Sequence, residues 1–304
     1  MVSRSLRALL SQSIDYAGLF PPCSLALEPA LKNHAGYTRL PEAWMLNSFV
    51  LPVGQFASAK QFLTEFDPDH PLHISALGPK TDDVSSFRTA LTKAAAAIRS
   101  FSAHNVDLIL VKQLEMPIIA GADSDLLREA QSIVKDLPVF WEAPPQMADR
   151  VISLLAKHND HVGEPAFGFK LRTGGVTADA FPNTAQIARA LVAPAKHQLP
   201  VKFTAGLHHP IRQFRDEVKA KMHGFLNVMG AAVLGAEHRW DEQQTALMLA
   251  DESAAGFSFD DHGFSWGEWR IETKRIQDRR RFVTSFGSCS FDEPRDDLRA
   301  LNLL

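Results

Sequence analysis

Two lysines lie inside apolar segments of this 304-residue chain, each shortly before a glycine-bearing loop. Lys170 stands in Phe-Gly-Phe-Lys-Leu-Arg-Thr-Gly-Gly (167–175), and Lys202 stands in Val-Lys-Phe-Thr-Ala-Gly-Leu-His-His-Pro (201–210). Taking an ammonium group out of water costs several kcal/mol unless other groups compensate it. Two buried lysines on neighbouring strands would lower each other's pKa, and the neutral amine that results is a nucleophile for carbonyl groups.

Strand alternation predicts which side chains share a cavity with these lysines. Along 167–172 the bulky apolar residues alternate with Lys170 and Arg172, and along 201–204 they alternate with Lys202 and Thr204. Since apolar side chains pack against covering helices, the polar sets should face the interior of a barrel. The same rule turns further polar residues inward: His73, Ser75, Lys112, Glu142 and Asn227.

The predicted interior carries more positive than negative charge, and Glu142 is its clearest counter-charge. Fixed positive charge in a small cavity favours an anionic or carbonyl substrate. Glycines in the following loops would let backbone amides approach such a ligand. The expected substrate-binding residues are therefore Lys112, Arg172, Thr173, Gly174, Thr204, Gly206, His208, His209, Arg212 and Asn227.

Short apolar runs separated by helical stretches set the architecture that must position these residues. The runs predict strands at 15–20, 44–51, 72–77, 107–112, 139–142, 167–172, 201–204 and 225–229. Helices are expected at 82–104, 124–137, 146–158 and 184–197, with Asp82 and Ser124 as N-caps. Eight strand–helix units predict an α/β fold, a single (β/α)8 TIM barrel. A doubly wound sheet is the rival, but no Gly-x-Gly-x-x-Gly follows the first strand.

No Gly/Ser-rich or low-complexity segment divides the chain as an interdomain linker would, so residues 1–304 are expected to form one domain. After residue 254 we expect a C-terminal extension: a hairpin at 257–269, a basic helix at 271–283, and a segment at 285–294 that folds over the barrel mouth as a lid. Cys289 lies in that last segment, where an incidental thiol is favoured over a nucleophile.

Composition narrows the class of partner. A net charge of −3 gives no field for nucleic acid or an anionic membrane, and no apolar run has the ~20 residues of a membrane span. Two cysteines far apart, without a signal-peptide pattern, predict a cytoplasmic protein. The expected partner is a small anionic or carbonyl metabolite, no cofactor or metal is assigned, and a homo-oligomer is left open.

At the two lysine segments the chain resembles class I aldolases of the deoxyribose-phosphate aldolase type. That family carries Lys-x-x-Thr-Gly on strand six, which Lys170 to Gly174 match, and Lys-x-x-Gly-Gly on strand seven, which Lys202 to Gly206 match with Ala205 in place of the first Gly. The resemblance implies that Lys170 forms a Schiff base and that Lys202 lowers its pKa. It also implies that Asp107, in Val-Asp-Leu-Ile, assists the carbinolamine step.

The expected function is thus an aldolase-like lyase that acts on a small anionic carbonyl compound, with Glu142 moving protons. Three other interpretations remain open. The lysines pair with acids as structural ion pairs. The protein is a metal-dependent lyase or isomerase that uses Glu142 and His208 or His209, although adjacent histidines on an extended chain point in different directions. The barrel binds a metabolite without catalysis.

Overall fold

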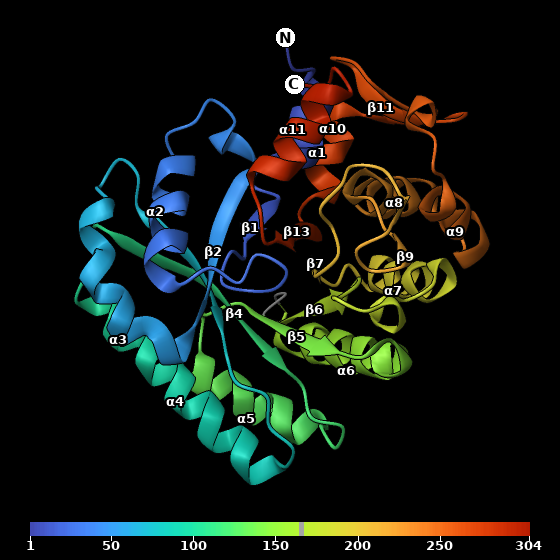
Figure 1. Cartoon of the computed structure of the whole chain (residues 1–304). Helices are drawn as coiled ribbons and strands as arrows, with labels where there is room; N and C mark the ends of the chain where they lie inside the picture. The colour runs from blue at the N-terminus through green and yellow to red at the C-terminus, as the bar shows by residue number, and fades with distance from the viewer. Residues whose placement is uncertain (164–166) are drawn as a thin grey trace.

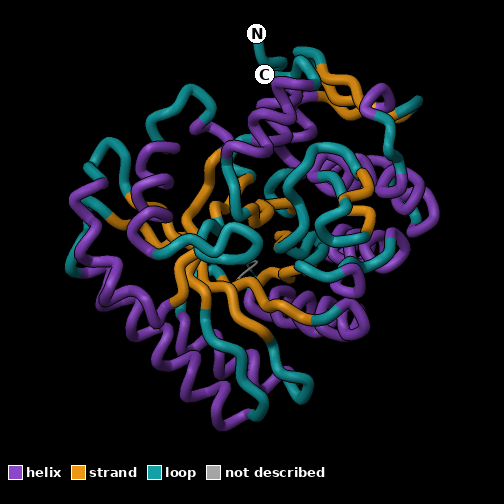
Figure 2. The backbone as a smooth tube through the Cα atoms, viewed as in Figure 1, coloured by secondary structure: helices purple, strands orange, loops and turns teal. Residues whose placement is uncertain are grey.

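The computed structural model describes residues 1–163 and 167–304, and its centre is a closed barrel of parallel strands (Figures 1 and 2). Going round the barrel, each strand pairs with the next in the order β1, β2, β3, β4, β5, β6, β7, β13, and β13 pairs with β1. The predicted α/β barrel class is confirmed. The barrel strands are β1 (Ile14–Tyr16), β2 (Leu46–Pro52), β3 (Leu72–Leu77), β4 (Ile109–Pro117), β5 (Val139–Ala143), β6 (Phe167–Arg172), β7 (Val201–Thr204) and β13 (Val283–Ser288).

Helices follow the strands and cover the outside of the barrel (Figure 1). Several begin where the sequence offers a capping side chain: Asp83 accepts hydrogen bonds from the amides of Ser85 and Ser86. The helices are α1 (Arg4–Leu10), α2 (Leu27–Tyr37), α3 (Phe56–Ala59), α4 (Val84–Ala103), α5 (Ser124–Val134), α6 (Ala148–Val162), α7 (Thr184–His197), α8 (Phe225–His238), α9 (Glu242–Ala250), α10 (Thr273–Arg279) and α11 (Asp292–Ala300).

The apolar side chains of the strands pack outward against these helices, as alternation predicts. Trp141 of β5 lies against Phe87 of α4 with ring centroids 5.4 Å apart. Phe286 of β13 stacks on Phe225 of α8 with centroids 5.2 Å apart. Phe140 is the exception, because it fills the barrel interior beside Gly168, where a Cβ atom would come within 2.5 Å of the Phe140 ring. The interior is thus packed rather than open.

The eighth barrel strand is not the expected one. Residues 225–229 are the first turns of α8, so the prediction of a strand there is wrong. The segment at 285–294, expected to be a lid, instead forms β13 and the start of α11, and β13 pairs with both β1 and β7. The C-terminal part of the chain therefore closes the barrel.

Between β7 and β13 the chain adds two small sheets and the three helices α8, α9 and α10. A hairpin of β8 (Gln213–Arg215) and β9 (Ala220–Met222) precedes α8 and α9. The predicted hairpin near 257–269 is a three-stranded sheet of β10 (Phe257–Phe259), β11 (Gly263–Trp266) and β12 (Trp269–Glu272), which packs against α1, α8 and α10. Across the described ranges, no helix is both long and apolar enough to cross a membrane.

Three pairings of the barrel contain a register shift, and each shift changes where a side chain points. The shifts lie between β1 and β2, between β3 and β4, and between β7 and β13. In the pairing of β3 with β4, Ile74 pairs with Val111 but Ser75 pairs with Gln113, so Lys112 is an extra residue in β4. An extra residue reverses the alternation that follows it, which turns Gln113 and Glu115 into the barrel.

Candidate active site

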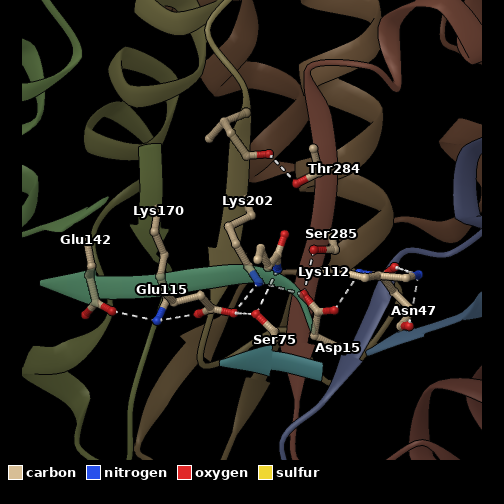
Figure 3. Close-up of polar contacts among 12 residues, drawn as sticks. Asp15, Asn47, Ser75, Lys112, Glu115, Glu142, Lys170, Lys202, Thr284 and Ser285 are labelled. Atoms are coloured by element: carbon tan, nitrogen blue, oxygen red, sulfur yellow. Dashed lines mark hydrogen bonds and ion pairs between the residues drawn. The ribbon is translucent and has the colours of Figure 1, made fainter. Parts of the chain in front are cut away.

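The barrel interior holds an unbroken row of five charged side chains, which we call the ion chain: Glu142, Lys170, Glu115, Lys202 and Asp15 (Figure 3). Lys170 Nζ lies 2.8 Å from Glu142 Oε2 and 2.7 Å from Glu115 Oε2. Lys202 Nζ contacts the other oxygen of Glu115 and lies 2.7 Å from Asp15 Oδ2. Carboxylates and ammonium groups therefore alternate from β5 across to β1.

Neutral side chains hold the two inner carboxylates. The Ser75 hydroxyl donates to Glu115, and Gln113 Nε2 donates to the Ser75 oxygen at 2.8 Å. At the β1 end, Ser285 Oγ donates to Asp15 Oδ2 at 2.6 Å and Asn47 Nδ2 donates to Asp15 Oδ1 at 2.7 Å. Each buried oxygen thus has a donor, which is what keeps an ionised group stable without water.

The protonation of Lys170 differs from the expected one. Burial by itself would lower the pKa of this lysine, but the carboxylates of Glu115 and Glu142 outweigh burial and raise the pKa above its ordinary 10.5. Lys202 does lie on the adjacent strand and in register with Lys170, as expected. Because Glu115 stands between the two ammonium groups, Lys202 does not lower the pKa of Lys170 as expected.

Glu115 is the counter-charge that both lysines share. Burial acts to raise the pKa of its carboxyl group, and the charges of Lys170 and Lys202 lower it well below the ordinary 4.5. Glu115 is therefore ionised at neutral pH although it is only 2% exposed. Glu115 and Lys170 are therefore a charged rather than a neutral pair.

Only one end of the ion chain is open to solvent. The Glu142 side chain is 20% exposed, whereas those of Lys170 and Lys202 are 5% and 1% exposed. Arg172, at the carboxyl end of β6, lies with Nη1 3.6 Å from Glu142 Oε1. Arg172 also lines a cavity of ≈ 250 Å³ between the loops after β5 and β6, together with Gln146, Phe181 and Gln186. This cavity lies at the carboxyl ends of the strands, where barrel enzymes bind substrates.

Asp107 does not belong to this site, so the position of its side chain does not fit the expected role in the carbinolamine step. Asp107 is exposed and precedes the first residue of β4. Two further acids that meet the lysines, Glu115 and Asp15, are not among the predicted site residues. The available signal was an acid flanked by apolar residues in a strand: Leu114-Glu115-Met116 and Ile14-Asp15-Tyr16. The predicted strand at 107–112 ends before Glu115, so its alternation does not extend to that residue.

The glycines and threonines that follow the lysines hold two loops together. The Thr173 amide donates to Thr204 O at 2.9 Å, and its hydroxyl donates to the Thr204 and Ala205 carbonyls. A Cβ atom on Gly174 would come within 2.5 Å of the Phe181 ring and 3.0 Å of Gly206 Cα, and Gly206 has a φ of +76°. These residues therefore serve the close packing of the loops after β6 and β7 under Phe181.

His208 and His209 connect the loop after β7 to α11. His208 Nδ1 lies 3.1 Å from Glu293 Oε2, and His209 Nδ1 lies 2.6 Å from Asp297 Oδ2. Both rings are buried and face different acids, as expected for adjacent histidines. Neither has Glu142 among its contacts. Within residues 1–163 and 167–304, no group of three or more His, Cys, Asp or Glu side chains is arranged to hold a metal ion.

Three expected substrate-binding residues lie away from Glu142. Asn227 is in α8, not in a strand, and its side chain bonds to the Arg212 amide and to the Met248 and Asp251 carbonyls. The Arg212 side chain contacts Lys221 O and Glu252. Lys112 Nζ lies 2.9 Å from Asn47 Oδ1, toward the amino ends of the strands. The expectation that Asn227 faces the barrel axis is therefore wrong.

Fold and site together define a parallel (β/α)8 barrel with a buried ion chain that opens at the carboxyl ends of its strands. No family model matches the chain, and no curated protein matches it. Among solved structures, the endo-1,4-beta-xylanase XylE of Penicillium canescens is similar over 96% of this chain and 87% of that chain, with 10% sequence identity and a TM-score of 0.42. That likeness is too distant to support any argument about activity.

Proposed function

We propose that the protein is a lyase that acts on a small anionic carbonyl compound through an imine on Lys170. The observation that carries this proposal is the contact between Lys170 Nζ and Glu142 Oε2, at 2.8 Å. It joins a buried amine on β6 to a partly exposed acid at the open end of the site. Lys202 on β7 and the Lys-x-x-Thr-Gly segment that resembles class I aldolases support the same chemistry.

In the proposed reaction, Lys170 first passes a proton to Glu142, which frees the amine. The amine nitrogen attacks the carbonyl carbon. The carbonyl oxygen takes one proton from that nitrogen and one back from Glu142 and leaves as water, so that a protonated C=N bond replaces C=O and Glu142 is again a carboxylate. When the carboxylate of Glu142 then removes the proton of a β-hydroxyl group, the adjacent C–C bond breaks and its electron pair moves toward the iminium nitrogen. Protonation of the resulting enamine and hydrolysis of the imine restore Lys170.

The remaining side chains have supporting roles in this proposal. Arg172 binds the anionic group of the substrate, because its side chain is half exposed, contacts Glu142 and lines the cavity between the loops after β5 and β6. Glu115 and Lys202 keep the charge of the inner site balanced while the proton on Lys170 moves. Asp15 holds Lys202 in place at the inner end of the ion chain.

Borohydride reduction tests the imine directly. The protein is incubated with acetaldehyde, glyoxylate or pyruvate together with sodium borohydride, and peptides are mapped by mass spectrometry. We expect a reduced adduct on Lys170 above the level on the exposed Lys93 and Lys219, and none on residue 170 in Lys170→Arg, which keeps the charge. If Lys170 never exceeds the exposed lysines, the imine mechanism is wrong; stabilisation by a carbonyl compound without turnover would instead favour a binding protein.

The raised pKa of Lys170 favours a second candidate function, a carbonyl isomerase. In that reaction Glu142 removes a proton next to the carbonyl group, and the Lys170 ammonium stabilises the enolate that forms. No covalent adduct arises. The test is exchange of substrate hydrogen with deuterated solvent. Exchange that is lost in Glu142→Gln, without any adduct trapped by borohydride, would favour this candidate over the lyase.

A further inference from the structure

A second cavity, of ≈ 710 Å³, opens at the opposite end of the barrel from Glu142. Its walls come from the amino-terminal side of the barrel: Ser11 and Gln12 precede β1, Asn47 is near the start of β2, and Thr284 is near the start of β13. Helices α1 and α10 supply the outer wall through Arg4, Arg7, Thr273 and Gln277. Nothing in the proposed reaction uses this cavity.

Five cationic side chains line the cavity: Arg4, Arg7, Lys112, Arg280 and Arg281. No aspartate or glutamate is among the lining residues, and in the described part of the chain none of the five forms an ion pair. Arg7 lies over the Trp44 ring, and Arg280 donates to backbone carbonyls such as Leu9 O and Val283 O. Positive charge is thus concentrated here in a protein whose net charge is −3.

The register shifts of the barrel aim side chains at this same cavity. Asn47 is the extra residue of β2, because Ile14 pairs with Leu46 but Asp15 pairs with Ser48. Lys112 is the extra residue of β4, and the shift in β13 falls at Thr284 and Ser285. Such bulges are common at barrel rims and near functional sites, where they redirect single side chains. Three of them supply lining residues of one cavity: Asn47, Lys112 and Thr284.

Electrostatics and shape together specify the ligand. Unpaired cations around a concave surface focus a positive potential, and guanidinium groups match phosphate oxygens in geometry. The neutral lining residues are amides and hydroxyls, which suit hydroxyl groups: Gln12, Asn47, Gln113, Thr273, Gln277 and Thr284. We infer that the amino-terminal mouth of the barrel is a binding site for a small phosphorylated polyol or sugar, independent of the reaction at Glu142.

A line of contacts joins this mouth to the ion chain. Lys112 Nζ contacts Asn47 Oδ1 at 2.9 Å, and Asn47 Nδ2 donates to Asp15 Oδ1 at 2.7 Å (Figure 3). Asp15 in turn holds Lys202. The Lys112 side chain is therefore two contacts away from Asp15, the inner end of the ion chain.

Pyrophosphate is the probe for this site. Calorimetric titration at constant ionic strength is expected to show saturable binding to one site per chain. Arg4→Gln combined with Arg281→Gln should weaken it by roughly tenfold or more, which corresponds to about 1.4 kcal/mol. Neither side chain has a hydrogen bond or ion pair among the described residues, so the variant should fold. Arg88→Gln with Arg128→Gln removes the same charge from α4 and α5 and should leave the binding unchanged.

A measurement on the unaltered protein keeps the test independent of the variants. Acetic anhydride labels accessible amines, and pyrophosphate should protect Lys112 but not the exposed Lys93. Absence of saturable binding would overturn the inference. Equal weakening in the two double variants would overturn it as well, since it would mean that only net charge matters. Unprotected Lys112 at saturating pyrophosphate would place the anion elsewhere and overturn it too.

Discussion

At the scale of single residues, the site depends on Glu115 more than on the lysines that drew attention to it. Each lysine has one outer partner, Glu142 for Lys170 and Asp15 for Lys202, and both share Glu115 between them. Replacing one buried charge of such a row leaves its neighbours without compensation, which costs more than the intact pair contributes. The central carboxylate therefore holds two cations within a buried interior.

Glu115→Gln is expected to lower the free energy of unfolding by about 3–5 kcal/mol, because Lys170 and Lys202 then face each other without the shared charge. Urea denaturation at neutral pH measures the loss. Glu142→Gln is the matched control, since its carboxylate is partly exposed and Lys170 keeps Glu115. If Glu115→Gln lowers the free energy of unfolding no more than the control does, water reaches the interior more readily than the contacts indicate.

Imine formation on Lys170 should depend on pH in a definite direction. The pKa of Lys170 lies above 10.5 because Glu115 and Glu142 outweigh the effect of burial. At any pH below that value, the neutral amine therefore becomes about tenfold more abundant for each unit by which the pH rises. The rate of imine formation is measured by adding borohydride only after timed intervals. This rate should therefore rise throughout the range from about pH 7 to 9. A plateau near neutral pH would mean that the lysine loses its proton far more easily.

What the sequence could reveal about the site follows from strand alternation. Alternation correctly predicts four interior side chains, because their strands are regular: Lys170, Lys202, Glu142 and Ser75. Lys112 and Glu115 share a strand in which an extra residue reverses the alternation, and no local pattern marks that residue. The protonation state of Lys170 was also out of reach, because it is set by acids from β4 and β5 that meet only in the barrel.

At the scale of elements, seven barrel strands followed from apolar runs, and the eighth did not. Residues 225–229 form a short apolar run that suits a buried strand or a buried helix equally well, and length alone cannot decide between them. In the structure α8 is buried along most of its length. β13 was missed because its small and polar residues, Thr-Ser-Phe-Gly-Ser, are typical of a loop.

The placement of β13 brings the two cysteines of the chain together. Cys23, exposed in the loop after β1, has its Sγ 3.0 Å from Sγ of the buried Cys289, which follows β13. We expect oxidised glutathione to convert them to an intramolecular disulfide, with both thiol protons and two electrons passing to form two glutathione thiols. Burial raises the pKa of Cys289 to about 12, so the second exchange step should accelerate as pH rises.

Thiol counting and peptide mapping after exposure to oxidised glutathione check this expectation. Cys23→Ser should leave Cys289 as a free thiol, because its buried sulfur is then out of reach of the reagent. Cys289→Ser should stop instead at a mixed disulfide on Cys23. A stable mixed disulfide on Cys23 in the unaltered protein would show that the two loops do not allow the sulfurs to approach.

At the scale of the whole molecule, the two ends of the chain close the barrel together. β13 lies between β1 and β7, and α11 then packs beside the first βα unit. Arg295 and Arg299 of α11 both pair with Glu42, at 3.2 and 2.7 Å, and Tyr37 of α2 donates to Asp292 at 2.6 Å. The strands β1 and β13, from the two ends of the chain, are paired in parallel and are labelled next to each other in Figure 1. The C-terminal residues are therefore part of the barrel wall and of its covering layer.

A chain that ends at Arg281 lacks β13 and α11, and we expect it to lose the native barrel. Removing β13 would expose the hydrogen-bonding edges of β1 and β7 and would take Ser285 away from Asp15. Near-ultraviolet circular dichroism and urea unfolding should then show neither fixed aromatic packing nor a cooperative transition. A chain that ends at Leu301 keeps both elements and should unfold like the full protein. If the shorter chain unfolded cooperatively as well, the tail would be an appendage over a barrel closed by other strands, as its loop-like composition first indicated.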